Sequence, residues 1–312
     1  MARRRVAIIG TGWVGASVAI STLHAGVADE LLLSDARADV AEGEALDLAQ
    51  GAAFYPSATV RTAQIEEMVD ADVVVVAAGS GGKPGQSRLE LLQGNASLVA
   101  DLGRRLAACR GTILMVSNPV DVLTRVMQQT SGLPPERVLG TGTVLDTARL
   151  RQMLGLELHV DPRSVHAHVV GEHGDSEVVL WSQADIGGVP LRDWPGWSAA
   201  REEPIALQVR RAAYEIIARK GATNHAIGLV AANVLRALLR DERRVLTVSR
   251  VHLQTLRGVA SELQLDGVAL SLPAVVGSGG ATQVLLPSLA PDEMSALQRS
   301  AKVLHDAAAT LH

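Results

Sequence analysis

A buried strand that leads through a glycine-rich turn into a helix restricts the fold of this chain more than any other stretch. The run Val6-Ala7-Ile8-Ile9 is apolar throughout, which is typical of a strand buried on both faces. It leads into Gly10-Thr11-Gly12-Trp13-Val14-Gly15 and a helical pattern over residues 16–25. The first glycine permits a tight bend, the second lets a pyrophosphate approach the backbone, and the third allows close helix packing. The turn therefore predicts a dinucleotide site formed by Gly10, Gly12, Trp13, Val14 and Gly15.

A carboxylate at the end of the next apolar run indicates which dinucleotide binds. The run Leu31-Leu32-Leu33 ends in Ser34-Asp35, so Asp35 lies 20 residues past Gly15. An acid at this distance accepts hydrogen bonds from the ribose hydroxyls and repels a 2′-phosphate. We therefore expect NAD rather than NADP. The nearby Arg37 weakens that distinction, and an aspartate in an ordinary surface turn is the alternative.

Strands and helices alternate up to residue 141. Strands are expected at residues 59–60, 72–77, 112–116 and 138–141, with helical stretches such as residues 42–53 between them. This alternation predicts βαβ units and an α/β fold with a Rossmann doubly wound parallel sheet. Ligands bind beyond the carboxyl ends of such strands. The loops over residues 79–87 and 117–119 should therefore face the ligand, and the first, with four glycines, should act as a lid.

The pattern changes beyond residue 142. Strands at 165–170 and 178–186 precede long helical patterns at 203–220 and 224–239, and residues 185–204 form a connection rich in Gly, Pro and Trp. Apolar runs at 245–248, 263–265 and 268–272 suggest an antiparallel group, and a final helix starts at Pro291. We therefore expect a Rossmann NAD-binding domain over residues 1–141 and a mixed α+β catalytic, substrate-binding domain over residues 142–312.

Composition excludes several functional classes. A net charge of −4 provides no electrostatic attraction for nucleic acid, and an aromatic content of 2% makes a base-stacking surface improbable. No apolar run reaches membrane-spanning length, so no membrane partner is expected. The basic start Met1–Arg5 is not followed by the apolar core of a signal peptide. Cys109 is the only cysteine, which excludes an internal disulfide, and we expect a cytoplasmic protein.

Three segments carry candidate catalytic groups. Gly171-Glu172-His173-Gly174-Asp175-Ser176 places a histidine, the side chain best matched to moving protons near neutral pH, among glycines that allow close approach. Asp146 and Arg149 lie three residues apart on one face of a predicted helix. Arg88 lies near a helix start, where a substrate anion would offset an unfavourable macrodipole. The alternatives are an ordinary turn for residues 171–176, a surface ion pair for Asp146 and Arg149, and a solvated side chain for Arg88.

In combination these motifs resemble the L-lactate and malate dehydrogenase family, and within it the bacterial L-lactate dehydrogenase branch. The resemblance rests on Ser117-Asn118-Pro119-Val120-Asp121, on residues 142–149 and on residues 171–176 in this order, and it covers the chain from Val6 to the final helix. It implies a mixed second domain and an enzyme that transfers hydride reversibly between NADH and pyruvate, interconverting a 2-oxo acid and an L-2-hydroxy acid.

The resemblance also implies a role for each candidate residue. His173 would donate the proton to the 2-oxo group, and Asp146 would orient its imidazole. Arg149 would clamp the substrate carboxylate through a bidentate fork, which lysine cannot reproduce. Arg88, carried by the closing loop, would polarise the carbonyl group.

Further contacts follow from the same resemblance. Asn118 would hydrogen-bond near the substrate oxygen beside the cofactor, and Thr223 would line the substrate pocket. Gly82 departs from the family, in which the residue before Lys-Pro-Gly is usually glutamine for lactate or arginine for malate. Without a cation there, malate and oxaloacetate are disfavoured. Thr223 matches the lactate branch, and the space left at Gly82 keeps bulkier 2-oxo acids open as substrates.

Regulation is a second implication of the resemblance. Allosteric bacterial lactate dehydrogenases bind fructose 1,6-bisphosphate through an arginine and a histidine that match Arg151 and His166. Opposed cations at a subunit interface repel one another unless a polyanion bridges them. A homotetramer with this effector is expected, although two unrelated surface residues and a dimer stay open.

Three other interpretations compete with that of a lactate dehydrogenase. A zinc site could be assembled from His166, His168 and His173, but no fourth ligand completes it, so no metal is expected. An NAD-binding sensor would keep the glycine turn and Asp35 without needing Asp146, Arg149 and His173 together. Malate dehydrogenase is the nearest enzymatic alternative.

Overall fold

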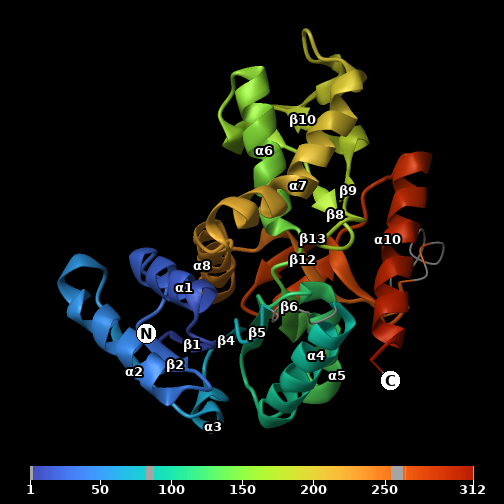
Figure 1. The fold of residues 1–312 in the computed structure, drawn as a ribbon. Helices are drawn as coiled ribbons and strands as arrows, with labels where there is room; N and C mark the ends of the chain where they lie inside the picture. Colours follow the sequence, from blue (N-terminus) through green and yellow to red (C-terminus); the bar gives the residue numbers. More distant parts are fainter. Residues whose placement is uncertain (1–2, 82–87, 254–262, 264, 312) are drawn as a thin grey trace.

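A nine-stranded sheet forms the centre of the molecule (Figure 1). The computed structural model describes residues 3–81, 88–253, 263 and 265–311. Six strands are parallel: β1 Arg5–Ile9, β2 Glu30–Ser34, β3 Thr59–Thr62, β4 Val73–Val76, β5 Thr112–Met115 and β6 Val138–Gly140. Three antiparallel strands extend the sheet beyond β6: β12 Arg244–Val251, β13 Ala269–Gly277 and β14 Gly280–Val284.

The parallel strands have the order β3-β2-β1-β4-β5-β6, which is that of a dinucleotide-binding sheet. The order reverses between β1 and β4, where such sheets bind their ligands at the carboxyl ends. The turn after β1 and the chain after β4 meet there, since a Cβ on Gly10 would lie 2.6 Å from the Cα of Ala78. The prediction of a Rossmann doubly wound sheet is therefore confirmed.

Helices cover both faces of the sheet because its strands are apolar on both sides. Val6 and Ile8 of β1 pack into one cluster with the helices of the first face, whereas Ala7 and Ile9 pack into another on the second face. The first face carries α1 Trp13–His24, α2 Ala38–Gln50 and α8 His225–Leu239. The second face carries α3 Ile65–Met68, α4 Arg88–Arg105 and α5 Val120–Ser131.

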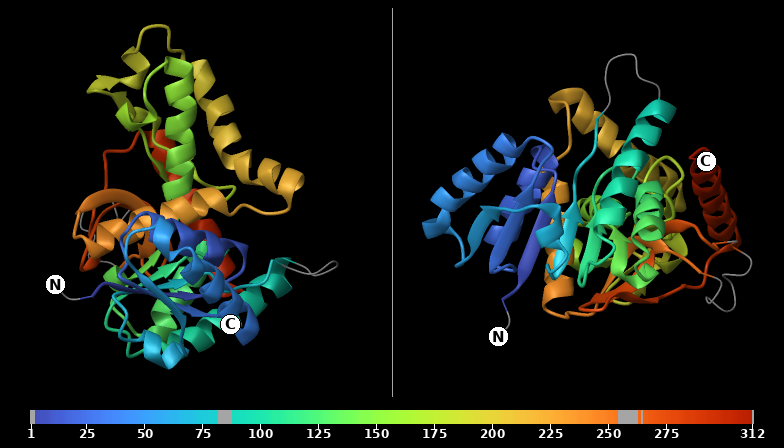
Figure 2. Two further views of the ribbon diagram at one scale, coloured as in Figure 1. Left: turned by 90° about the vertical axis from the view of Figure 1, so that its left-hand side faces the viewer. Right: turned by 90° about the horizontal axis from the view of Figure 1, so that it is seen from below.

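An upper lobe projects from this layered body (Figure 2). Its long helices are α6 Val144–Leu158 and α7 Glu202–Lys220, which pack around a core that includes Leu150, Val165 and Val209. Its short strands are β7 Val165–His166, β8 Val169–Val170, β9 Val178–Val179, β10 Asp185–Ile186 and β11 Val189–Pro190. Short 3₁₀ helices connect the elements of the chain: η1 Ala52–Phe54, η2 Pro135–Arg137, η3 Pro162–Ser164, η4 Trp181–Gln183, η5 Leu191–Asp193 and η6 Ala199–Arg201.

The structure corrects several expected elements of the second half. The antiparallel strands do not form a separate group, because Ser249 of β12 pairs with Gly140 of β6 and continues the first sheet. The run at 263–265 adds no described strand, since Leu263 is helical and Gln264 lies outside the described residues. The strand expected over 165–170 is two short strands in different sheets.

The C-terminal helix α10, Pro291–Ala309, closes one side of the molecule (Figure 1). It packs Leu297, Ala301 and Leu304 into a core shared with α5, β8, β9 and β13. This contact places α10 behind the segment that carries His173. Across the described ranges, no helix combines the length and apolarity that a bilayer crossing requires.

Candidate active site

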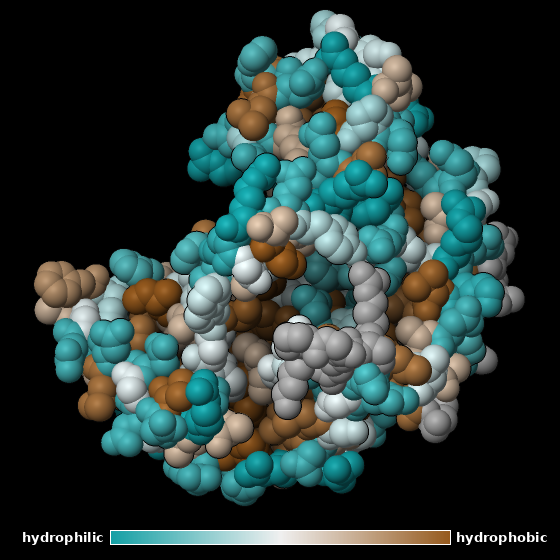
Figure 3. Space-filling view, in the orientation of Figure 1, coloured by the Kyte–Doolittle hydropathy of each residue, from teal (hydrophilic) through white to brown (hydrophobic). Residues whose placement is uncertain are grey.

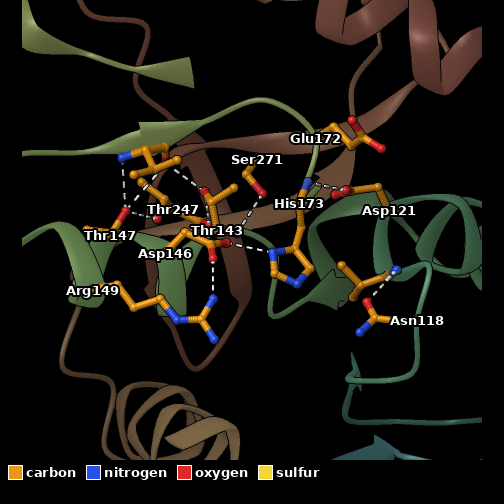
Figure 4. Close-up of polar contacts among 12 residues, drawn as sticks. Asn118, Asp121, Thr143, Asp146, Thr147, Arg149, Glu172, His173, Thr247 and Ser271 are labelled. Atoms are coloured by element: carbon orange, nitrogen blue, oxygen red, sulfur yellow. Dashed lines mark hydrogen bonds and ion pairs between the residues drawn. The ribbon is translucent and has the colours of Figure 1, made fainter. Parts of the chain in front are cut away.

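The candidate residues gather where α5, α6 and the segment after β8 meet. Asp146 and Arg149 lie on the first turns of α6, and His173 follows β8. Asn118 lies after β5, at the start of α5, and Figure 4 shows it on the side of the imidazole remote from Asp146. The face drawn in Figure 3 is hollowed between the sheet and the upper lobe, with apolar residues in the hollow.

Asp146 joins the other two predicted groups into one hydrogen-bonded row (Figure 4). Its Oδ2 lies 2.6 Å from His173 Nδ1, and its Oδ1 accepts a hydrogen bond of 2.8 Å from Arg149 Nη1. The Asp146 side chain is 2% exposed, that of Arg149 12% and that of His173 24%. A buried carboxylate therefore lies in the middle of the row, between two groups that reach the surface.

The row determines the proton affinity of its members. Burial by itself lowers the pKa of His173, but the charge and hydrogen bond of Asp146, with smaller contributions from Asp121 and Glu177, raise it to about 9. Burial disfavours the charged form of Asp146, but His173 and Arg149 together lower its pKa. An ionised Asp146 accepts a hydrogen bond from the N–H at Nδ1 of the ring, which leaves Nε2 free to exchange a proton with a ligand.

Buried threonines hold the start of α6 in place. Thr143 donates from Oγ1 to the Val169 carbonyl at 2.6 Å, and its backbone N–H donates to Ser271 Oγ at 3.0 Å. Thr147 accepts the Val169 N–H at 3.0 Å and pairs with Thr247 at 3.1 Å. These bonds tie α6 to β8, β12 and β13, so Asp146 occupies a fixed position. No role was predicted for these threonines from the sequence.

Two further carboxylates near His173 were also missed. The His173 N–H donates to Asp121 Oδ2 at 2.7 Å, and burial raises the pKa of Asp121 to about 6. Glu177 is 5% exposed, and burial followed by the charge of Asp146 raises its pKa. Asp121 is the last residue of one motif that carries the resemblance and Glu177 directly follows another, so their positions were the available signal. Nothing in the sequence indicated that they are buried.

The glycine turn has the geometry of a phosphate-binding turn. Gly10 has φ +92°, and a Cβ on Gly15 would lie 1.8 Å from the Gly10 carbonyl oxygen, so both positions require glycine. A Cβ on Gly12 would meet nothing within 4 Å, which leaves the N-terminus of α1 open to a ligand. Trp13 is 64% exposed beside it. This cradle fits a pyrophosphate.

Asp35 directly follows β2 and supports the turn. Its Oδ2 accepts the Thr11 N–H at 2.8 Å, and its Oδ1 accepts the Arg37 N–H at 3.0 Å. Burial opposes ionisation, but these hydrogen bonds lower the pKa of Asp35. Each oxygen of an ionised carboxylate accepts more than one hydrogen bond, so Asp35 also fits a ribose hydroxyl pair.

Some predicted residues are only partly placed. Arg88 begins α4, and nothing is described of its side chain, while Gly82 lies outside the described residues. Asn118 Oδ1 accepts the Val120 N–H at 3.3 Å. Thr223 lies in the half-buried connection between α7 and α8 and, within the described ranges, makes no hydrogen bond to the Asp146 row.

A separate cationic cluster lies in the upper lobe. Arg151 donates from Nε to the Ala167 carbonyl at 3.0 Å, and burial followed by the charge of Arg244 lowers its pKa. His166 is exposed, and both it and Arg151 act with burial to lower the pKa of His168 to about 4. Among the described residues, no three His, Cys, Asp or Glu side chains are grouped to hold a metal ion.

Comparison with known sequences gives the family of this chain. The family model for the lactate/malate dehydrogenase NAD binding domain matches residues 4–140, and that for the lactate/malate dehydrogenase alpha/beta C-terminal domain matches residues 143–311. The L-lactate dehydrogenase of Kosmotoga olearia is 43% identical over 96% of this chain and 94% of its own length. That of Thermus aquaticus is 44% identical over 98% of this chain and 99% of its own length.

A solved structure agrees with this relationship. The minor L-lactate dehydrogenase of Enterococcus mundtii in its ligands-bound form superposes with a TM-score of 0.94 at 39% identity, covering 99% of each chain. Matches of both family models, together with relatives above 40% identity along nearly the whole length, show that the chain belongs to the lactate/malate dehydrogenase family.

Proposed function

We propose that this protein is a cytoplasmic NAD-dependent L-lactate dehydrogenase, which reduces pyruvate to L-lactate and catalyses the reverse oxidation. The observation that carries the proposal is the row in which Asp146 binds both a proton-carrying ring and a guanidinium group. A 2-oxo acid needs these two groups, one for its keto oxygen and one for its carboxylate. The L-lactate dehydrogenases that resemble the chain along its length support the same assignment.

Proton transfer is assigned to His173. In the direction of reduction, C2 of pyruvate gains a hydride and its oxygen gains the proton from the imidazolium. Asp146 keeps the ring in the tautomer with a proton at Nδ1 and stabilises the charged form, so the ring is ready to donate before the substrate arrives. In the reverse direction the neutral ring accepts the proton of the lactate hydroxyl.

Substrate orientation is assigned to Arg149. Its Nη1 is bound to Asp146, whereas its other N–H groups make no hydrogen bond with the described part of the chain. A guanidinium that is anchored at one nitrogen presents a fixed fork to a carboxylate. Because Asp146 binds both residues, the proton donor and the carboxylate clamp keep a constant separation.

The dinucleotide is assigned to Gly10, Gly12, Trp13, Val14, Gly15 and Asp35. The open face at Gly12 receives the pyrophosphate and Asp35 the ribose, while Asn118 at the carboxyl end of β5 stands between the cofactor and the substrate. The reduced nicotinamide, when bound, supplies the hydride. On this basis nucleotide binding is assigned to residues 1–141 and substrate chemistry to residues 142–312.

Steady-state kinetics with NADH and a panel of 2-oxo acids tests the proposal. Pyruvate is expected to give the highest kcat/KM, above oxaloacetate, 2-oxoisocaproate and phenylpyruvate. A maximum with oxaloacetate would assign a malate dehydrogenase, and a maximum with the bulky acids would assign a broader L-2-hydroxy acid dehydrogenase. Absence of turnover with NADH still bound would favour a sensor. Gly82→Gln should sharpen the preference for pyruvate, and Gly82→Arg should shift it towards oxaloacetate.

A homotetramer regulated by fructose 1,6-bisphosphate is the second part of the proposal. It is supported by the charge of Arg244, which acts on Arg151, and by the charges of Arg151 and His166, which both act on His168, while Arg151 has no acidic partner among the described residues. A polyanion would relieve this repulsion. Pyruvate saturation curves should therefore shift to lower concentration when the bisphosphate is added. Curves that coincide with and without it, and a mass in solution below that of a tetramer, would refute this part.

A further inference from the structure

A second helix holds His173 independently of Asp146. The backbone N–H of His173 donates to Asp121 Oδ2 at 2.7 Å, whereas the ring binds Asp146 at 2.6 Å. Figure 4 shows the two acids on either side of the histidine. Asp121 lies in the first turn of α5 and Asp146 in the first turn of α6, so the backbone and the ring of one residue are fixed from two elements.

A structural anchor at this position does not require a charge. Asp121 is 2% exposed, and its Oδ1 makes no hydrogen bond with the part of the chain that the structure describes. Burial raises its pKa to about 6, so a charge there above this pH destabilises the fold. An asparagine would accept the same N–H without that disadvantage. The presence of an acid therefore points to a use for the charge.

Several other charged groups lie around His173 and Asp121. Asp146 and Arg149 face it from α6, and Glu172 and Glu177 from its own segment. Arg125, one turn after Asp121 on α5, lines a small cavity with Asp121 and with His305 of α10. The Arg125 Nε makes no hydrogen bond within the described residues.

We propose that Asp121 is a positioning residue for the proton transfer: its buried carboxylate fixes the backbone of His173 and places a second negative charge beside the imidazole. The charge favours the protonated ring, which is the form that reduces a 2-oxo acid. The inference rests on the proposed function, because it assigns Asp121 to the residue that moves the proton.

The Asp121→Asn variant tests the charge while keeping a hydrogen-bond acceptor for the His173 N–H. We expect the pH profile of kcat/KM for pyruvate to shift down by about one unit, from the loss of one nearby charge. The loss should be about tenfold above the wild-type pKa and slight near pH 6. Lactate oxidation should gain activity at neutral pH, since the ring loses its proton more easily.

A matched control removes a contact to the same segment without removing a charge. Ser300 of α10 is fully buried and accepts the Glu172 N–H at 2.7 Å, so Ser300→Ala loosens residues 171–176 from the other side. It should lower kcat without moving the pH profile. A profile for Asp121→Asn that keeps the wild-type pKa, or that falls equally at every pH, would overturn the proposal.

Two additions keep the test decisive. Asp121→Ser removes the same charge with a smaller side chain and should give the same shift in the pH profile. It takes the place of Asp121→Asn if that variant folds poorly. NMR titration of the His173 ring, assigned with His173→Gln, measures the shift without turnover. An inactive wild type would refute the proposed function, whereas an unchanged titration in Asp121→Asn would refute the role of Asp121.

Discussion

Replacing Asp146 with asparagine should remove both functions of the central row. Asp146 accepts from His173 at one oxygen and from Arg149 at the other, at 2.6 and 2.8 Å. Asparagine has one acceptor oxygen, so its amide NH₂ must face one of these two donors. If it faces the ring, the imidazole takes the opposite tautomer; if it faces Arg149, the clamp is displaced.

The expected magnitude follows from the proton affinity of His173. Its pKa is about 9 beside Asp146, and burial without the negative charge returns it to about 6.5 or below. This difference corresponds to about 3 kcal/mol of stabilisation of the imidazolium. At pH 8 the protonated fraction falls from about nine tenths to a few per cent, and the wrong tautomer lowers turnover further.

Stopped-flow and steady-state measurements of pyruvate reduction read this loss directly. We expect kcat/KM at pH 8 to fall by at least about 100-fold, with a pH profile moved to lower pH. Asp161→Asn is the control, because Asp161 also pairs with an arginine, Arg163 at 2.7 Å, but is 46% exposed and lies away from the site. A loss below tenfold for Asp146→Asn would refute the reasoning.

Three further predictions follow from individual contacts. Gly12→Ala should fold normally, because its Cβ meets nothing within 4 Å, yet raise the KM for NADH; Gly15→Ala should unfold at lower temperature, because its Cβ would lie 1.8 Å from a carbonyl oxygen. Arg149→Lys should raise the KM for pyruvate and lose about 3 kcal/mol in kcat/KM, since lysine cannot form the fork. Glu177→Gln should become progressively more stable than wild type in chemical denaturation as pH rises from about 4.5, because a buried acid with a raised pKa loses stability over that range. The first prediction would be contradicted if Gly12→Ala had the wild-type KM for NADH, and the second if Arg149→Lys had the wild-type KM for pyruvate. The third would be contradicted if the stability difference between Glu177→Gln and the wild type did not vary with pH.

The first half of the chain was predictable because its patterns are local. Continuous apolar runs specify strands buried on both faces, and β1 uses alternate residues against two helix layers. At Gly10 and Gly15 the geometry of the turn is visible in the residue types, since only glycine tolerates the close approaches there. The predicted strand bounds therefore differ from the observed ones by only a residue or two.

The second half was less predictable because its contacts join distant segments. The pairing of Ser249 with Gly140, which makes one sheet of two expected groups, has no local signature. The same is true of the contacts between Asp121 and His173, 52 residues apart, and between Glu172 and Ser300, 128 residues apart. The sequence contains these acids, but their proximity to His173, their burial and their resulting proton affinities depend on the packing of α5, α6 and α10.

We propose that His173, Asp146 and Arg149 form one unit that reduces pyruvate with NADH. The most direct measurement follows NADH consumption with pyruvate and then identifies the product with a stereospecific assay, for the wild type and for His173→Gln. We expect the wild type to form L-lactate and to consume one molecule of NADH for each molecule formed, and we expect His173→Gln to bind NADH but to form almost no lactate. A wild type that binds NADH without consuming it, or a His173→Gln variant that retains turnover, would contradict this mechanism.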